Sequence, residues 1–212
     1  MTAIALHGIS KAYRGQVLFA DLDARFETGR IHGIVGHNGA GKSVLFKIMC
    51  GFVRPDAGTV ELAPRHRPER GGFPRDVGVL IDRPGYLPDR TGFQNLAQLA
   101  AIRGVIGADE VRLAMTTVGL SPDLRQKVRH YSLGMKQKLA LAQAVMENQQ
   151  LLLLDEPCNA LDPDSVEDIR ILLDGYRRQG RTIIFTSHHH DDIDALSDHT
   201  HVLKRHRLER QD

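Results

Sequence analysis

A glycine-rich segment near the N-terminus has the residue types and spacing of a phosphate-binding loop. It reads Gly36-His37-Asn38-Gly39-Ala40-Gly41-Lys42-Ser43, followed by Val44, and fits the pattern G-x-x-x-x-G-K-[ST] at every fixed position. Glycines let the backbone curl so that several N–H groups point at phosphate oxygens, and a helix beginning near Lys42 adds the positive end of its dipole. Lys42 can reach the β- and γ-phosphates and Ser43 can ligate Mg²⁺. The segment therefore predicts a nucleotide site.

Two adjacent carboxylates could carry out chemistry on that nucleotide. Leu151–Leu154 is typical of a strand covered on both faces, and Asp155 and Glu156 follow it directly. Ligands of open α/β sheets bind at the carboxyl ends of the strands. We therefore expect Asp155 to hold Mg²⁺, directly or through water, and Glu156 to orient or deprotonate an attacking water. A strand that merely ends in surface acids is less favoured, because the same chain carries the phosphate loop.

The elements that must position these residues follow from the spacing of apolar residues and from Gly and Pro clusters. Strands are predicted within residues 1–35, including 30–35, and at 59–62, 77–81, 151–154 and 182–186, with a strand and a turn at 201–208. Helices are predicted at 42–50, 163–179 and 191–196 and in a block at 92–147 with breaks near 107 and 121–122, and 63–76 is expected to be a loop. Strands alternate with helices at both ends, which indicates a mostly parallel sheet with a helical insertion.

Composition and charge exclude several classes of protein. The 28 Lys and Arg residues nearly balance 26 Asp and Glu residues, and the formal net charge of +2 argues against a nucleic-acid partner. No apolar run reaches the roughly 20 residues of a membrane-spanning helix, and the first residues do not resemble a signal peptide. The two cysteines, Cys50 and Cys158, lack metal-site spacing. We therefore expect a soluble, cytoplasmic α/β protein.

A segment upstream of the leucine run resembles the LSGGQ signature of the ATP-binding cassette (ABC) family, the nucleotide-binding domains of ABC transporters. It reads Tyr131-Ser132-Leu133-Gly134-Met135-Lys136-Gln137, in which Ser132 and Gly134 match the motif. The form is similar to one in bacterial exporter ATPases of the peptide-antibiotic-resistance type. Elsewhere, Asn159–Asp162 looks like the D-loop, Ser187-His188 looks like the switch histidine, and Tyr13 lies where the family places an aromatic that stacks on adenine. The resemblance covers essentially the whole chain.

One position departs from the family pattern. The strand predicted at 77–81 should be followed by the Q-loop glutamine, but Asp82 stands there. A carboxylate at this point could still bind Mg²⁺. An acidic residue here is again similar to the peptide-antibiotic exporter subgroup.

The resemblance implies the fold and its division into parts. It predicts a single ABC ATPase domain over residues 1–212, with a P-loop NTPase core, a mostly parallel sheet, an N-terminal antiparallel β region and a helical insertion. Residues 1–81 and 148–212 would form the β-rich core. Residues 83–147 would form a helical subdomain that carries the signature motif.

The resemblance also implies a site shared between two chains. Ser132 and Gly134 of one protomer would bind the γ-phosphate of ATP held by the other. Within one chain, the implied roles are catalysis for Glu156 and His188, metal binding for Ser43, Asp82 and Asp155, and nucleotide binding for Tyr13, Gly36, His37, Asn38, Gly39, Ala40, Gly41, Lys42, Ser43, Val44 and Asp162.

The partners implied are a second ABC ATPase subunit, identical or different, and a membrane permease. ATP would hold two cassettes together, and hydrolysis to ADP and phosphate would open the dimer. A separate permease, contacted near Asp82 and residues 83–90, would place the chain on the inner face of the cell membrane. Two alternatives stay open: a soluble ABC-type ATPase that is not coupled to transport, and a regulatory nucleotide-binding module with weak hydrolysis.

A run of three histidines, residues 188–190, could suggest a metal site. The switch role accounts for His188, and consecutive residues of a helix do not face one site. We therefore favour an interpretation without a metal at this run.

Overall fold

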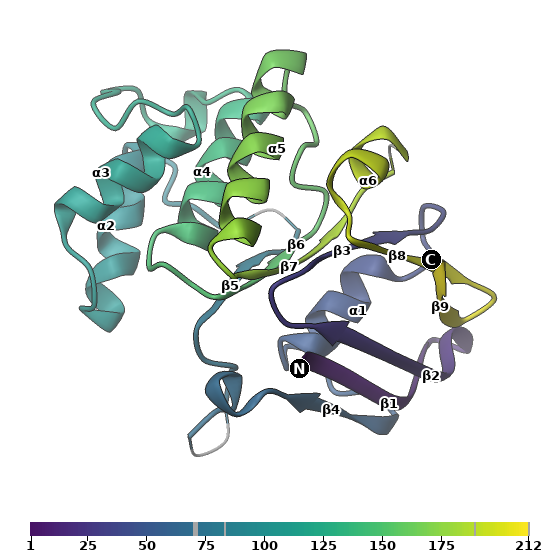
Figure 1. The fold of residues 1–212 in the computed structure, drawn as a ribbon. Coiled ribbons are helices and arrows are strands. Elements are labelled where there is room, and N and C mark those ends of the chain that lie inside the picture. The colour runs from purple at the N-terminus through teal and green to yellow at the C-terminus, as the bar shows by residue number, and fades with distance from the viewer. Residues whose placement is uncertain (70–71, 83, 189, 212) are drawn as a thin grey trace.

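The computed structural model describes residues 1–69, 72–82, 84–188 and 190–211, whose strands form two sheets (Figure 1). One sheet is antiparallel, in the order β2-β1-β4, and consists of β1 Thr2–Tyr13, β2 Gln16–Glu27 and β4 Ala57–Leu62. The other has the order β5-β6-β7-β3-β8-β9 and is parallel except for its last strand. Its strands are β3 Ile31–Val35, β5 Val77–Leu80, β6 Leu151–Leu154, β7 Thr182–Thr186, β8 His199–Lys204 and β9 Arg207–Gln211.

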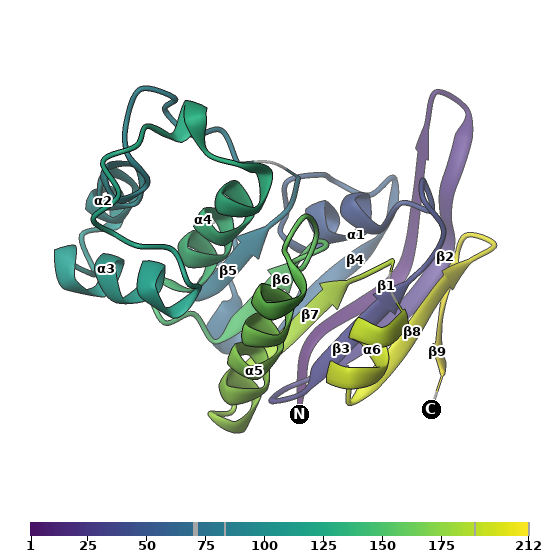
Figure 2. The ribbon, with the colours of Figure 1, turned by 90° about the horizontal axis from the view of Figure 1, so that it is seen from above.

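Helices cover both faces of the parallel sheet (Figure 2). Helix α1 lies on the face that the antiparallel sheet shares, whereas α4 and α5 pack on the opposite face. The helices are α1 Lys42–Met49, α2 Gly92–Arg103, α3 Ala108–Thr117, α4 Leu133–Val145, α5 Pro163–Arg178 and α6 His190–Leu196, with short 3-10 turns at Pro64–His66 and Val128–His130.

Strand β6 shows why the two layers form. Its four leucines are fully buried, and successive side chains of a strand point to opposite faces. Leu151 and Leu153 join the core around α1, and Leu152 and Leu154 join the core under α4 and α5. Burying each leucine contributes about 1.5–3 kcal/mol. The strand is therefore held from both sides, and its carboxyl end, where Asp155 follows, has a fixed place.

Helices α2, α3 and α4 pack together beside the parallel sheet, on the side away from the N-terminal strands (Figure 1). Leu96, Val111, Met115 and Leu139 are fully buried among them. A capping box starts α2, and Gly104 ends it with a left-handed φ of 64°. The apolar core of this block is continuous with the core between the parallel sheet and α5, so the block and the sheet are packed as one unit.

The predicted class of fold is confirmed: a mostly parallel sheet with an antiparallel N-terminal region and a helical insertion. The helices at 42–50 and 163–179 and the strands at 151–154 and 182–186 agree with the structure to within one residue. The strand and turn predicted at 201–208 are instead a hairpin of two strands, β8 and β9. These strands are rich in polar and basic residues and so lack a clear apolar pattern. They are held in the sheet because β8 pairs with β3 and β9 pairs with β8.

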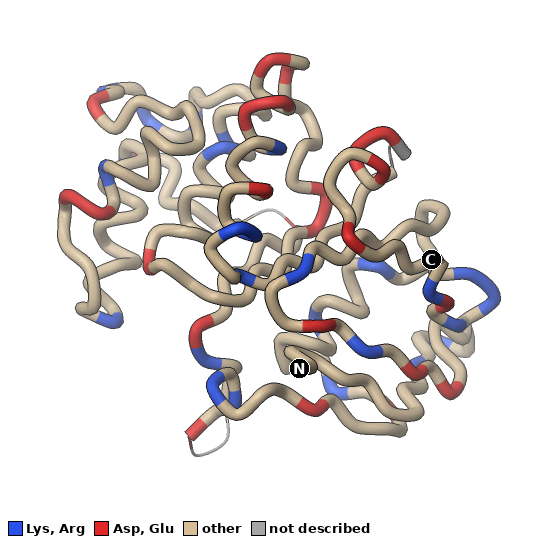
Figure 3. The backbone as a smooth tube through the Cα atoms, in the orientation of Figure 1, with Lys and Arg blue, Asp and Glu red and all other residues tan. Residues whose placement is uncertain are grey.

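Basic and acidic residues are interspersed along the backbone, in line with the near-balanced composition (Figure 3). A short basic stretch occupies the β8–β9 turn, which contains Lys204, Arg205 and Arg207. Among the described residues, no helix is long and apolar enough to cross a membrane.

Candidate nucleotide and catalytic site

The phosphate loop joins the end of β3 to the start of α1, as the motif predicts. Gly41 caps α1 with a left-handed φ of 101°, and a Cβ at this position would come within 3.0 Å of the Phe19 ring. Glycine therefore suits both the conformation and the space. The loop borders a cavity of about 430 Å³ whose lining consists of Leu18, residues 37–44, Asp155 and Glu156.

Lys42 links the loop to the acidic strand end. Its side chain is only 8% exposed, and its Nζ donates to the Gly36 carbonyl oxygen at 2.8 Å. The same Nζ lies 3.9 Å from Glu156 Oε1. The ammonium group is thus buried between the glycine backbone and a carboxylate, within the cavity that the loop lines.

Asp155 is fixed by the neighbouring strand. The hydroxyl of Thr186, at the end of β7, donates to Asp155 Oδ1 at 2.6 Å. The Asp155 N–H donates to the Leu80 carbonyl oxygen at 2.7 Å, so β5 holds its backbone from the other side. One carboxylate oxygen is therefore engaged, and the other is available as a hard oxygen ligand of the kind that Mg²⁺ prefers.

Glu156 and His188 form a pair at the same edge. His188 Nδ1 lies 2.7 Å from Glu156 Oε2, and the His188 N–H donates to the same oxygen at 3.3 Å. The structure thus brings together the two residues that the sequence predicts to be catalytic. A carboxylate oriented by a neighbouring histidine can accept a proton from a water molecule.

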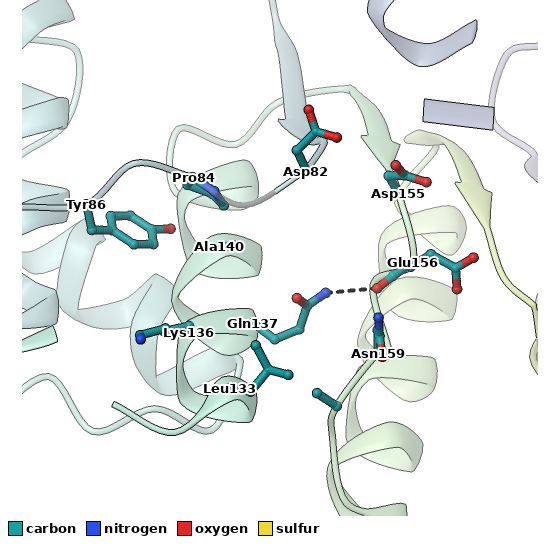
Figure 4. Close-up of a pocket in the computed structure, with 11 residues that line it drawn as sticks. Asp82, Pro84, Tyr86, Leu133, Lys136, Gln137, Ala140, Asp155, Glu156 and Asn159 are labelled. Atoms are coloured by element: carbon teal, nitrogen blue, oxygen red, sulfur yellow. Dashed lines mark hydrogen bonds between the residues drawn. The ribbon is translucent and has the colours of Figure 1, made fainter. Parts of the chain in front are cut away.

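Asp82 lies close to this edge, but its carboxylate contacts a lysine. Lys47 Nζ, in the second turn of α1, lies 2.6 Å from Asp82 Oδ2, and the Asp82 side chain is 55% exposed. Asp82 also lines a second cavity of about 250 Å³ together with Asp155, Glu156, Gln137 and seven further residues (Figure 4). The metal-binding role of Asp82 stays a prediction. If Asp82 binds Mg²⁺, its carboxylate would contact both the ion and Lys47.

The signature residues lie at the start of α4, outside the cavity of the phosphate loop. The Ser132 hydroxyl caps α4 by accepting from the Met135 N–H at 3.1 Å. A Cβ on Gly134 would lie 2.9 Å from the Ala160 carbonyl oxygen, so glycine allows α4 to approach the D-loop closely. Within one chain, neither Ser132 nor Gly134 reaches the described lining of the phosphate-loop cavity.

Two further predicted nucleotide contacts have local partners in the structure. Asp162 caps α5, and the hydrogen bonds from the Ser165 N–H and hydroxyl lower the pKa of its carboxyl group. Tyr13 ends β1 with its side chain 44% exposed, and Lys11 Nζ lies 5.1 Å from the centroid of its ring. Leu18, rather than Tyr13, is the described residue of the N-terminal sheet that lines the phosphate-loop cavity.

Some residues that the sequence analysis considered lie outside the described part of the chain, and the Cys158 thiol is unreactive. His189 and Arg83 lie outside the described residues, and the side chain of His190 is not described. Burial raises the pKa of the Cys158 thiol to about 12, so its reactive thiolate form is disfavoured. The described residues contain no cluster of ligands that could hold a metal through His, Cys, Asp and Glu alone.

Three side chains that hold the site together were not predicted from the sequence: Thr186, Gln137 and Lys47. Thr186 is a polar residue that ends an otherwise apolar buried strand, which is a signal that could have identified it. Gln137 lies three residues after Gly134 on the same helix. Lys47 is the basic residue in the last turn of α1, and nothing local indicates its partner.

A phosphate loop and two acids at the carboxyl edge of a mostly parallel sheet define the class of P-loop nucleoside triphosphatases. The chain belongs to the ABC transporter family, whose pattern matches residues 19–159. Members of this family bind and hydrolyse ATP, so the chain is an ATPase.

Relatives and solved structures agree with this assignment. The chain is 34% identical to the ABC transporter ATP-binding protein YybJ of Bacillus subtilis (strain 168), over 97% of this chain and 94% of that protein. It is 35% identical to the bacitracin transport ATP-binding protein BcrA of Enterococcus faecalis, over 92% of this chain but only 64% of that protein. The dimeric structure of the bacterial ABC transporter cassette MJ0796 shares its fold, with a TM-score of 0.84, 20% identity and coverage of 99% and 98%.

Proposed function

We propose that the chain is the ATP-hydrolysing subunit of an exporter and drives a separate membrane permease. The observation that carries this proposal is the convergence of Lys42, Asp155, Glu156 and His188 at one edge of the sheet. Lys42 Nζ lies 3.9 Å from Glu156 Oε1, and His188 Nδ1 lies 2.7 Å from Glu156 Oε2. A cation for the phosphates and an oriented carboxylate for the attacking water are the groups that ATP hydrolysis requires.

The loop at residues 36–43 would bind the phosphates of ATP through its backbone N–H groups and the start of α1. Lys42 would exchange the Gly36 carbonyl for the β- and γ-phosphate oxygens, which are stronger acceptors because they are charged. The half-exposed ring of Tyr13 would stack on adenine. These contacts would fix the γ-phosphate beside Glu156, because the phosphate loop and Glu156 line the same cavity.

The oxygen donors at the site fit Mg²⁺. Ser43 and Asp155 line the phosphate-loop cavity, and Asp82 lies in the adjoining one. A hydroxyl and carboxylates are the hard ligands that suit this ion. When bound, Mg²⁺ would neutralise charge on the β- and γ-phosphates.

Glu156 would act as the general base of hydrolysis. The water oxygen would form a bond to the γ-phosphorus while one water proton passes to the Glu156 carboxylate. The bond from the γ-phosphorus to the oxygen that bridges to the β-phosphate would break, which releases ADP and phosphate. His188 would hold the carboxylate in place through its ring nitrogen and its backbone N–H.

The second half of each site would come from another cassette. Ser132 and Gly134 lie at the start of α4, where a hydroxyl and a helix N-terminus can donate to a phosphate, yet they lie outside the phosphate-loop cavity of their own chain. A two-fold dimer would bring them to the partner's nucleotide. The dimeric form named for MJ0796 supports this arrangement.

The permease would dock beside the phosphate-loop core and take the chain to the inner face of the membrane. Phe52 and Phe73 pack edge to face, with ring centroids 5.2 Å apart, although they are 52% and 65% exposed. Exposed aromatic pairs of this kind favour a protein partner. Leu87, 46% exposed, lies in the segment expected to contact the permease. The transport of bacitracin that names BcrA supports an exporter for peptide antibiotics.

Replacing Glu156 by Gln tests the catalytic part of the proposal, the role of Glu156 as general base. The amide keeps the size of the side chain but cannot accept the proton, so steady-state hydrolysis should fall about 10²–10⁴-fold while ATP binding persists. Glu167→Gln, on the exposed face of α5, is the matched control and should hydrolyse ATP at the wild-type rate. Wild-type turnover by Glu156→Gln would overturn the assignment of the base.

A further inference from the structure

The peptide units on both sides of Glu156 are held by side chains from two different parts of the fold. On the amino side, the Glu156 N–H donates to Thr186 Oγ1 at 2.9 Å, and the same hydroxyl donates to Asp155 Oδ1 at 2.6 Å. On the carboxyl side, Gln137 Nε2 donates to the Glu156 carbonyl oxygen at 2.9 Å (Figure 4). It also donates to the Pro157 carbonyl oxygen at 3.0 Å. The Glu156 N–H and the carbonyl groups of Glu156 and Pro157 therefore each have a side-chain partner.

Thr186 is suited to this position because of its chemistry and its burial. Its side chain is fully buried at the end of β7, and a hydroxyl can accept one hydrogen bond while it donates another. Both bonds together fix the orientation of the hydroxyl, so it ties the Asp155 carboxylate to the Glu156 backbone. Removing it would leave two partly buried polar groups, the Asp155 carboxylate and the Glu156 N–H, without this partner.

Glu156 needs such restraint because its backbone is left-handed. Its φ is 52°, a conformation that residues with a side chain adopt rarely. The side chain leaves the backbone in the direction that this φ sets, and in this direction Oε2 meets His188 Nδ1 and Oε1 approaches Lys42 Nζ. A relaxed backbone would point the carboxylate elsewhere.

We propose that Thr186 and Gln137 are positioning residues for ATP hydrolysis, which act by holding Glu156 in its left-handed conformation. The proposal rests on the proposed role of Glu156 as general base. Thr186 belongs to the parallel sheet, whereas Gln137 belongs to α4, the helix that begins with the signature residues. A shift of α4 would therefore change the orientation of the Glu156 carboxylate through the hydrogen bonds of the Gln137 amide.

The test compares Thr186→Val, Thr186→Ser and Gln137→Met in ATP binding and steady-state hydrolysis. Valine and methionine keep the approximate shape and remove the polar groups, so kcat should fall about tenfold or more, as part of the roughly 10²–10⁴-fold that a positioned base supplies. The Kd for ATP should change less than about threefold, because neither residue lines the phosphate-loop cavity. Thr186→Ser keeps the hydroxyl and should retain most of the wild-type kcat.

Thr182→Val is the matched control. Thr182 is equally buried at the other end of β7, and its hydroxyl accepts from the Gly29 N–H at 2.9 Å, far from the acidic edge. Its loss should lower the thermal midpoint but leave kcat near the wild-type value. Equal loss of kcat in Thr182→Val and Thr186→Val would show a merely structural effect and overturn the proposal. If Thr186→Val does not fold, Gln137→Met decides: a kcat near the wild-type value would overturn the proposal.

A double variant separates this inference from the proposed function. If Thr186 acts through Glu156, Thr186→Val should add little to the single-turnover defect of Glu156→Gln. Additive losses, or wild-type kcat in both Thr186→Val and Gln137→Met, would overturn the inference and leave the role of Glu156 intact. Wild-type hydrolysis by Glu156→Gln would instead remove the general base, and the inference with it.

Discussion

Three non-glycine residues around the acidic edge have left-handed backbones: Asp82, Glu156 and Ala160, with φ of 55°, 52° and 63°. Each costs about 1–2 kcal/mol relative to an ordinary conformation. Such strain persists where surrounding contacts over-determine it, and it gathers at functional sites. Here the conformations aim Glu156 at His188 and place the Ala160 carbonyl against Gly134.

Lys42→Ala should weaken ATP binding about 10–100-fold, because a hydrogen bond to a charged group contributes about 1.5–3 kcal/mol. Lys42 is the cation that the phosphate-loop cavity presents to the nucleotide. Equilibrium binding of a labelled nucleotide measures the change. Lys127→Ala, whose amine lies 4.0 Å from Asp89 in an exposed pair, is the control and should bind normally. Unchanged affinity in Lys42→Ala would contradict the assignment of the loop.

Asp82→Asn should weaken ATP binding about tenfold with Mg²⁺ and less than about threefold in EDTA, because a carboxylate attracts the metal but repels a phosphate. Asp82→Gln should restore part of the activity. Lys47→Met is the matched variant, since it frees the carboxylate from its 2.6 Å ion pair without removing it. Lys47→Met should bind ATP more tightly with Mg²⁺ than in EDTA, as the wild type should. Equal losses with and without metal, or none in either condition, would show that Asp82 does not act on the metal.

At the scale of elements, β3 and β8 bury a cluster of histidines on the far side of the parallel sheet from the helical block. His32 is fully buried, accepts from the Glu27 N–H at 2.9 Å and lies 3.3 Å from His201 Nε2. Burial lowers the pKa of His32 from 6.5 to about 4. The exposed rim of the cluster consists of Glu27, His199 and Arg210, which interact with one another.

This cluster should make the fold acid-sensitive. The folded pKa of His32 lies below the unfolded value, so the unfolded chain binds the proton first and stability is lost as pH falls from about 6.5 to about 4. Complete protonation of His32 should lower the free energy of unfolding by about 3 kcal/mol. His32→Gln, which does not titrate, should flatten this dependence in urea melts. His7→Gln, at an exposed site, should keep the wild-type slope, and an identical slope in His32→Gln would contradict the prediction.

At the scale of the whole molecule, one chain contains both halves of a site but does not bring them together. The phosphate loop and Glu156 line one cavity, whereas Ser132 and Gly134 lie outside it at the start of α4. Two chains in a two-fold arrangement would form two composite sites. ATP would then bind at the interface and control its opening.

Mixing two inactive variants should reveal the shared site. Ser132→Asp keeps a good helix cap but places a negative charge beside the partner's phosphate, and Lys42→Ala disables the other half-site. Each alone should be nearly inactive. An equal mixture should recover about a quarter of wild-type hydrolysis, since half of the dimers carry one intact site of two. Ser132→Asn, a neutral cap, is the control for charge. No recovery in the mixture would contradict a site shared between chains.

Local chemistry in the sequence was enough to predict the phosphate loop, the acidic strand end and the main helices and strands. The loop is encoded in eight consecutive residues, and β6 in four leucines that must be covered on both faces. The division of the chain at residues 83 and 147 stays a prediction. Of the β8–β9 hairpin, one strand and the turn were predicted, but β9 was missed because its side chains are mostly polar and it is held by pairing with β8, which in turn pairs with β3.

Only the tertiary structure decided which side chains hold the catalytic residues. Thr186 reaches Asp155 and the Glu156 N–H because β7 pairs with β6, a neighbour chosen by sheet order. Gln137 reaches the other side of Glu156 because α4 packs against β5, the strand next to β6. Lys47 meets Asp82 because α1 lies beside the end of β5. Such hydrogen bonds and ion pairs depend on distances of about 3 Å between residues far apart in the chain, and no local pattern of residue types specifies those distances.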